Sequence, residues 1–98
     1  MYKRPEEGVI RVRVPRGRET FGTVIEMLGA SRFRVQGIDG NERICRIPGK
    51  FKRNVLVKIG DIVLIEPWTV QADERADIIW RYKPLQVDWL VKRGFLKL

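Results

Sequence analysis

The segment RIPGKFKRN, residues 46–54, holds four cations and no anion, and Pro48 and Gly49 interrupt it. Like charges placed this close repel one another, so either a partner or the solvent must supply the counter-charge. Arg and Lys side chains bind phosphate, and aromatic rings can stack on nucleic-acid bases. The residues that could do this chemistry are the cations of the segment and its flanking strands, with two nearby aromatic rings: Arg32, Arg34, Arg43, Arg46, Lys50, Phe51, Lys52, Arg53 and Trp68.

Residue types that support catalysis or hold metals are scarce. The chain has no histidine, and Cys45 is its single cysteine. A zinc site needs four ligands, mostly Cys and His, and histidine-based acid–base chemistry is also excluded. Carboxylate pairs remain possible, but the acids lie in or beside turns next to basic residues, and none stands out as catalytic. The sequence therefore predicts a protein that is not an enzyme and uses no metal and no cofactor.

The positive charge is concentrated in two parts of the chain. The net charge is +8 over 98 residues, with +4 in residues 1–18, −2 in residues 19–31 and +6 in residues 32–58, whereas residues 59–98 are neutral overall. A polyanion, either nucleic acid or an anionic membrane surface, is the default partner of such a chain. No apolar run approaches the ~18 residues of a membrane span, and the N-terminus lacks the apolar region of a secretory signal. With no disulfide possible within the chain, these features predict a cytoplasmic protein that does not enter membranes.

The elements that must position these residues are short strands. Apolar and polar residues alternate strictly in RFRVQG, where Phe33 and Val35 point one way and Arg32 and Arg34 the other. Asp39-Gly40 is a strong hairpin signal, because glycine tolerates the positive φ of a type I′ turn. Similar patterns predict five strands in total, over residues 20–28, 32–37, 42–47, 61–68 and 76–82.

In the first of these strands, alternation places four residues on one side, namely Phe21, Thr23, Ile25 and Met27, and Gly22 suggests a bulge. Five short strands with close turns predict an all-β fold, a small antiparallel barrel of the OB-fold type. A single helical turn would fill the connection around residues 48–54. We expect three parts: a flexible basic N-terminal arm (1–18), the barrel (19–83), and a C-terminal helix (84–98) that begins at Pro84, stops near Gly94 and packs on the barrel.

Each candidate side chain also has a purely structural interpretation. The alternation of Arg32 and Arg34 is first of all what a solvated strand face looks like. Phe51 could stack on a base, or anchor its own loop in the barrel, and Trp68 could do either at the barrel mouth. Cys45 is expected in the core. Phe21 and Phe33 are also expected in the core. Trp80 and Tyr82 are expected under the terminal helix, packed with Trp89 of that helix.

The charge favours one barrel face. In an OB-fold, strands two and three form the usual oligonucleotide surface, and the cations fall on those strands and on the loop that follows. RNA is favoured over duplex DNA, because no basic recognition helix and no zinc-finger pattern is present.

The central sequence resembles a known family. The stretch EMLGASRFRVQGIDGNERICRIPGKFKRNVLVKIGDIVLIEPW, followed by ADIIWRY, resembles the archaeal form of translation initiation factor 1A, over about residues 19–96. The resemblance implies an S1-type OB-fold that binds small-subunit ribosomal RNA at the decoding (aminoacyl-tRNA) site. It implies a role in initiation-complex assembly and start-codon selection, together with other initiation factors. The RNA contacts implied are Arg46, Lys50, Lys52 and Arg53 in the loop, with Arg34 and Arg43 on the adjoining strands.

Two departures from the family pattern stand out. Eukaryotic and some archaeal relatives have a tryptophan where this chain has Leu56, so a stacking role is lost there. Eukaryotic relatives also end in a long acidic tail, whereas this sequence ends in KRGFLKL. We expect a monomer. The alternative is a general RNA-binding OB-fold protein, such as an RNA chaperone or a ribosomal protein.

Overall fold

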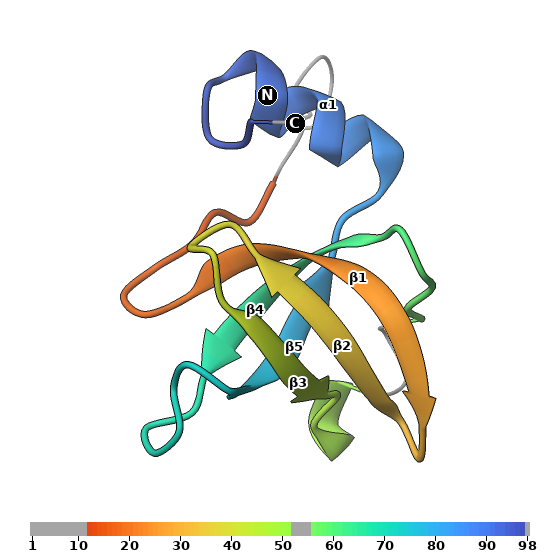
Figure 1. Cartoon of the computed structure of the whole chain (residues 1–98). Helices are drawn as coiled ribbons and strands as arrows, with labels where there is room; N and C mark the ends of the chain where they lie inside the picture. Colours follow the sequence, from red (N-terminus) through yellow and green to blue (C-terminus); the bar gives the residue numbers. More distant parts are fainter. Residues whose placement is uncertain (1–11, 52–55, 98) are drawn as a thin grey trace, which may run out of the picture.

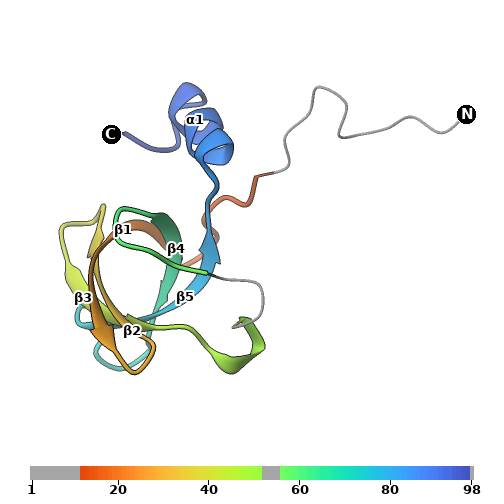
Figure 2. The same cartoon turned by 90° about the vertical axis from the view of Figure 1, so that its right-hand side faces the viewer.

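The computed structural model describes residues 12–51 and 56–97, and its strands form a closed barrel (Figures 1 and 2). The strands are β1 (Thr20–Gly29), β2 (Arg32–Gly37), β3 (Glu42–Arg46), β4 (Ile62–Pro67) and β5 (Arg75–Arg81), in the order β1-β2-β3-β5-β4. A single 3-10 turn, η1 (Gly49–Phe51), follows β3, and α1 (Pro84–Lys92) lies beyond the opposite end of the barrel (Figure 1). The predicted five-stranded barrel with a C-terminal helix is confirmed.

The long first strand closes the barrel. β1 pairs with β4 through residues 20–23 and with β2 through residues 22–29. Gly22 lies in both pairings, and a side chain there would collide with Val35 and meet the Gln36 carbonyl oxygen at 3.2 Å. Glycine is therefore required at the point where β1 pairs with both of its neighbours.

The predicted side-chain alternation along β1 is wrong. The pairing of β1 with β2 is irregular between Val24 and Glu26, not at Gly22. Such an irregularity shifts the alternation of side chains by one position. Phe21 and Val24, which precede it, are buried in different apolar clusters on opposite faces of β1, whereas Ile25 and Met27, at and beyond the irregularity, are exposed at 41% and 54%.

The turns also differ from the sequence prediction. In the β2–β3 hairpin, the Gly37 amide donates to the Asn41 carbonyl at 2.9 Å, and only Gly40 has a positive φ, 92°. A type I′ turn needs two consecutive positive φ angles, so the predicted type is not adopted at Asp39-Gly40. The β1–β2 hairpin has them instead, at Ala30 (51°) and Ser31 (58°).

One strand pair is parallel. β3 and β5 pair in register Ile44 with Arg75, Cys45 with Ala76 and Arg46 with Asp77, while the other four pairs are antiparallel. This pairing seals the barrel and brings an acidic residue beside Arg46.

Two apolar clusters stabilise the molecule. The first fills the barrel and includes Val24, Val35 and Cys45, so the predicted core position of Cys45 is confirmed. The second joins the barrel to the helix through residues of β1, β4, β5 and the C-terminal segment: Phe21, Ile62, Leu64, Ile79, Tyr82, Leu90 and Leu96.

The segments at the two ends of the described chain join this second cluster. Val12 and Val14, from the N-terminal end, pack against it, as do Trp80 of β5 and Trp89 of α1. Gly94, with a φ of 81°, lies just beyond α1, near the predicted stop. No helix within these described residues has the length and apolarity to cross a membrane. Residues 1–11 of the predicted arm lie outside them.

Candidate nucleic-acid interface

The outer face of β2 and β3 carries three cross-strand pairs. Arg32 lies opposite Arg46, Arg34 opposite Ile44, and Gln36 opposite Glu42. Directly opposite like charges destabilise a sheet. The Arg32–Arg46 pair is at the end of the ladder nearest η1, where Lys50 is also exposed. The strongest accumulation of positive charge on this face is therefore at that end.

Arg34 differs from its neighbours because acidic residues surround it. Its Nε donates to Glu26 at 2.9 Å and its Nη1 to Glu42 at 3.2 Å. Hydrogen bonds to Glu26 and then to Glu42 raise the pKa of the guanidinium. The predicted basic face is thus not uniform, since one cation in its middle is paired with two carboxylates.

Arg43 does not belong to the exposed face, and this corrects the sequence prediction. Its side chain is only 3% exposed. Its Nη2 donates to Asp39 at 2.7 Å, and its Nε donates to the Ala72 carbonyl at 2.6 Å. Arg43 and Arg46 are three residues apart, so strand alternation places them on opposite faces. Arg43 therefore joins the β2–β3 hairpin to the β4–β5 loop.

The Asp39 carboxylate completes this connection. Hydrogen bonding to Arg43 holds the pKa of Asp39 below its ordinary value, against the opposing effect of partial burial. Asn41 extends the link, since its side-chain amide donates to Asp73 at 3.3 Å.

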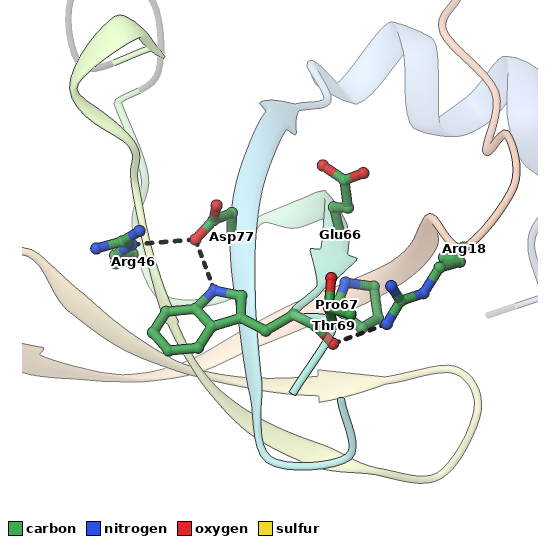
Figure 3. Close-up of a pocket in the computed structure, with 7 residues that line it drawn as sticks. Arg18, Arg46, Glu66, Pro67, Thr69 and Asp77 are labelled. Carbon is green, nitrogen blue, oxygen red and sulfur yellow. Dashed lines mark hydrogen bonds and ion pairs between the residues drawn. The ribbon is translucent and has the colours of Figure 1, made fainter. Parts of the chain in front are cut away.

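Arg46 is held by two neighbours (Figure 3). Its Nε donates to Asp77 Oδ1 at 3.2 Å, and its guanidinium lies 5.0 Å from the centre of the Trp68 ring. The Trp68 Nε1 donates to the same Asp77 oxygen at 2.9 Å. Arg18 donates to the Trp68 carbonyl at 2.7 Å. Trp68 is half-buried, so it lies at the edge of the barrel wall, neither inside the core nor fully exposed to solvent.

Three adjoining hollows share Arg46 in their lining. The first extends to Arg18 and Thr69, the second to Arg32 and Gly49, and the third lies between Trp68 and Arg75. Together they form what we call the arginine groove, a surface over β2, β3, β5 and the end of β4 whose lining includes four arginines: Arg18, Arg32, Arg46 and Arg75. Asp77 and Glu66 are its acidic members. Its four arginines against two acids suit a polyanion.

The loop after β3 is only partly described. Phe51 is half-buried and packs against both apolar clusters, which supports the anchoring interpretation over base stacking. The Lys50 Nζ lies 5.2 Å from the Phe51 ring centre. Lys52 and Arg53 lie outside the described residues.

Sequence reasoning missed three residues of the groove. The sequence pattern places Arg18 in the flexible arm, and Arg75 and Asp77 in a neutral part of the chain. The signal for Asp77 is indirect, because only a parallel β3–β5 pairing brings it beside Arg46.

A closed five-stranded barrel with an arginine-lined outer groove defines an OB-fold protein suited to nucleic acid. Residues 10–97 match the family model described as Translation initiation factor 1A / IF-1. The chain is 52% identical to translation initiation factor 1A of Methanococcus aeolicus, over 99% of this chain and 96% of that protein. It is 49% identical to the factor of the same name from Archaeoglobus fulgidus, over 94% of this chain and 96% of that one.

A solved structure supports the same family assignment. Translation initiation factor IF-1 from the Wolbachia endosymbiont of Brugia malayi superimposes with a TM-score of 0.55 at 33% identity, covering 74% of this chain and 85% of that one. The chain therefore belongs to the translation initiation factor 1A / IF-1 family, whose members act in protein synthesis and are not enzymes.

Proposed function

We propose that this initiation factor binds small-subunit ribosomal RNA at the decoding, aminoacyl-tRNA site. There it promotes initiation-complex assembly and start-codon selection, beside other initiation factors. Family membership implies the small subunit as the partner. The observation that carries the RNA proposal is the convergence of three hollows on Arg46, with Arg18, Arg32 and Arg75 around it. The factor acts as a cytoplasmic monomer.

The physical role of the groove is to neutralise phosphates. Each guanidinium offers several donors in a plane, which matches the oxygens of a phosphate group. A phosphate between Arg32 and Arg46 would also relieve the repulsion of these two opposed cations. Affinity should then depend strongly on salt, because each neutralised phosphate releases condensed counterions. The loop cations Lys50, Lys52 and Arg53 would extend the same contact.

Chemical footprinting of purified small subunits tests this proposal. We expect the protein to protect nucleotides of the decoding site, and we expect tRNA at that site or a decoding-site antibiotic to compete with it. Protection scattered over the subunit, without competition, would instead indicate the alternative of a general RNA-binding OB-fold protein. The double variant Lys92→Gln with Lys97→Gln serves as the charge control, because it removes two exposed cations near α1, at the end of the molecule away from the groove. We expect it to leave the protection of the decoding site unchanged.

A further inference from the structure

Asp77 is an acidic residue inside a surface proposed to bind phosphate, which is unfavourable for simple electrostatic attraction. It lies on β5 opposite Arg46 of β3 on one side and opposite Glu66 of β4 on the other. Its side chain keeps 25% of its exposure, so it is partly solvated. A carboxylate at this place would repel an approaching phosphate. Its position therefore calls for a role other than attraction.

The contacts of Asp77 suggest that role. A single oxygen, Oδ1, accepts from the Trp68 Nε1 at 2.9 Å and from the Arg46 Nε at 3.2 Å. The carboxylate thus uses the inner nitrogen of the guanidinium. Within residues 12–51 and 56–97, the two terminal nitrogens of Arg46 have no hydrogen-bond partner. These two nitrogens form the fork with which arginine binds phosphate in a bidentate manner.

Trp68 supplies the second constraint. Its ring lies 5.0 Å from the Arg46 guanidinium, and its backbone is tied on both sides. The Trp68 amide donates to the Arg75 carbonyl at 3.0 Å, and its carbonyl accepts from Arg18 at 2.7 Å. The ring is therefore a fixed surface over which the guanidinium lies while its Nε is held.

We propose that Asp77 and Trp68 are positioning residues that orient Arg46 for one RNA phosphate of the small subunit. This inference rests on the proposed function and assigns the specificity of the same groove. Holding the guanidinium in advance lowers the entropy lost on binding. The carboxylate also weakens attraction to phosphates that approach in any other geometry. Asp77 thus lowers general RNA affinity and raises affinity for the matching site.

This proposal predicts opposite signs for two measurements on Asp77→Ala. The variant gains one unit of net positive charge, so its affinity for a single-stranded homopolymer such as poly(U) should rise. Its affinity for purified small subunits should nevertheless fall by about tenfold, the value of one charge-assisted hydrogen bond. Asp77→Asn keeps an acceptor oxygen, so it should recover part of the subunit affinity. Trp68→Leu should lower subunit affinity without raising poly(U) affinity.

The matched control is Asp88→Ala. Asp88 is an exposed acid on α1 paired with Lys92 at 3.1 Å, so this variant changes net charge equally at the other end of the molecule. It should not weaken subunit binding. Circular dichroism and a thermal melt establish that each variant is folded. If Asp77→Ala does not fold, Asp77→Asn provides the test in its place.

The outcomes separate the two proposals. If the wild-type protein ignores small subunits, the proposed function fails. If the wild type binds but Asp77→Ala binds subunits as tightly or more tightly, the positioning role is overturned and Asp77 is only a repulsive charge. Equal losses on subunits and on poly(U) would also overturn it, because they would indicate a structural effect without site preference.

Discussion

Arg32 and Arg46 face each other directly across the β2–β3 ladder. Of these two arginines, Arg46 alone has an acidic partner among the described residues, Asp77 at 3.2 Å. This arrangement lowers the stability of the free sheet and suits an anionic ligand. We therefore expect Arg32→Gln to increase the free energy of unfolding by about 0.2–1 kcal/mol. The same change should weaken binding to small subunits. Urea unfolding and a subunit binding assay measure the two effects, and a variant that loses stability would contradict the expected repulsion.

The buried Arg43 contacts predict a stability effect of a different kind. Arg43→Ala leaves the Asp39 carboxylate and the Ala72 carbonyl without their partner. The Asp39 carboxylate that remains is 37% exposed, so the expected loss is that of unpaired polar groups, about 1–3 kcal/mol. Arg43→Met keeps the apolar stem and should lose less, because part of the cost is lost packing. A drop in the urea midpoint with an unchanged salt dependence of subunit binding is the expected result. A change in that salt dependence would indicate instead that Arg43 contacts RNA.

Gly22 should not accept even one methyl group. An alanine at this position would collide with Val35 where β1 passes from β4 to β2. Overpacking of this kind costs about 1–3 kcal/mol. Gly49→Ala is the control, because a Cβ there would meet nothing within 4 Å. Thermal melts should separate the two variants by several degrees, and equal melting temperatures would show that the barrel adjusts freely.

Cys45 should behave as a protected thiol. Its side chain is 1% exposed, and burial raises its pKa from 9.0 to about 12, while the charge of Arg43 acts in the opposite direction. Because the folded thiol keeps its proton where the unfolded one loses it, this contribution to stability is full below pH 9.0 and declines as pH rises toward about 12. At pH 8, an aromatic disulfide reagent should label Cys45 only at the rate of unfolding. Rapid labelling of the native protein would contradict the burial of this thiol.

The barrel could be predicted from the sequence because alternation, turn residues and strand spacing agreed with one another. Errors appeared where local pattern and tertiary pairing diverged. An unbroken strand would place Ile25 and Met27 on one face, but the irregular pairing after Val24 interrupts that alternation, and both side chains are exposed. The Asp39-Gly40 turn was correctly placed, and its type was wrong because only Gly40 takes a positive φ.

The candidate site could be predicted in part. Arg32, Arg46 and Lys50 are exposed at one end of the β2–β3 face, as the charge pattern indicated. The burial of Arg43 could have been predicted, because its odd spacing from Arg46 places the two on opposite faces. Arg18, Arg75 and Asp77 could not, since the barrel brings them to Arg46 across long sequence separations.

The central claim is that cations of the arginine groove bind ribosomal RNA phosphates. The most direct test is the salt dependence of binding to purified small subunits for Arg32→Gln with Arg46→Gln, against Lys92→Gln with Lys97→Gln. Both double variants remove the same charge, but at opposite ends of the molecule. The groove variant should flatten the slope of log affinity against log salt by about 0.7–0.9 for each phosphate that it no longer neutralises, and the control should leave the slope nearly unchanged. Equal slopes for the two variants would mean that the groove is not the RNA-binding surface.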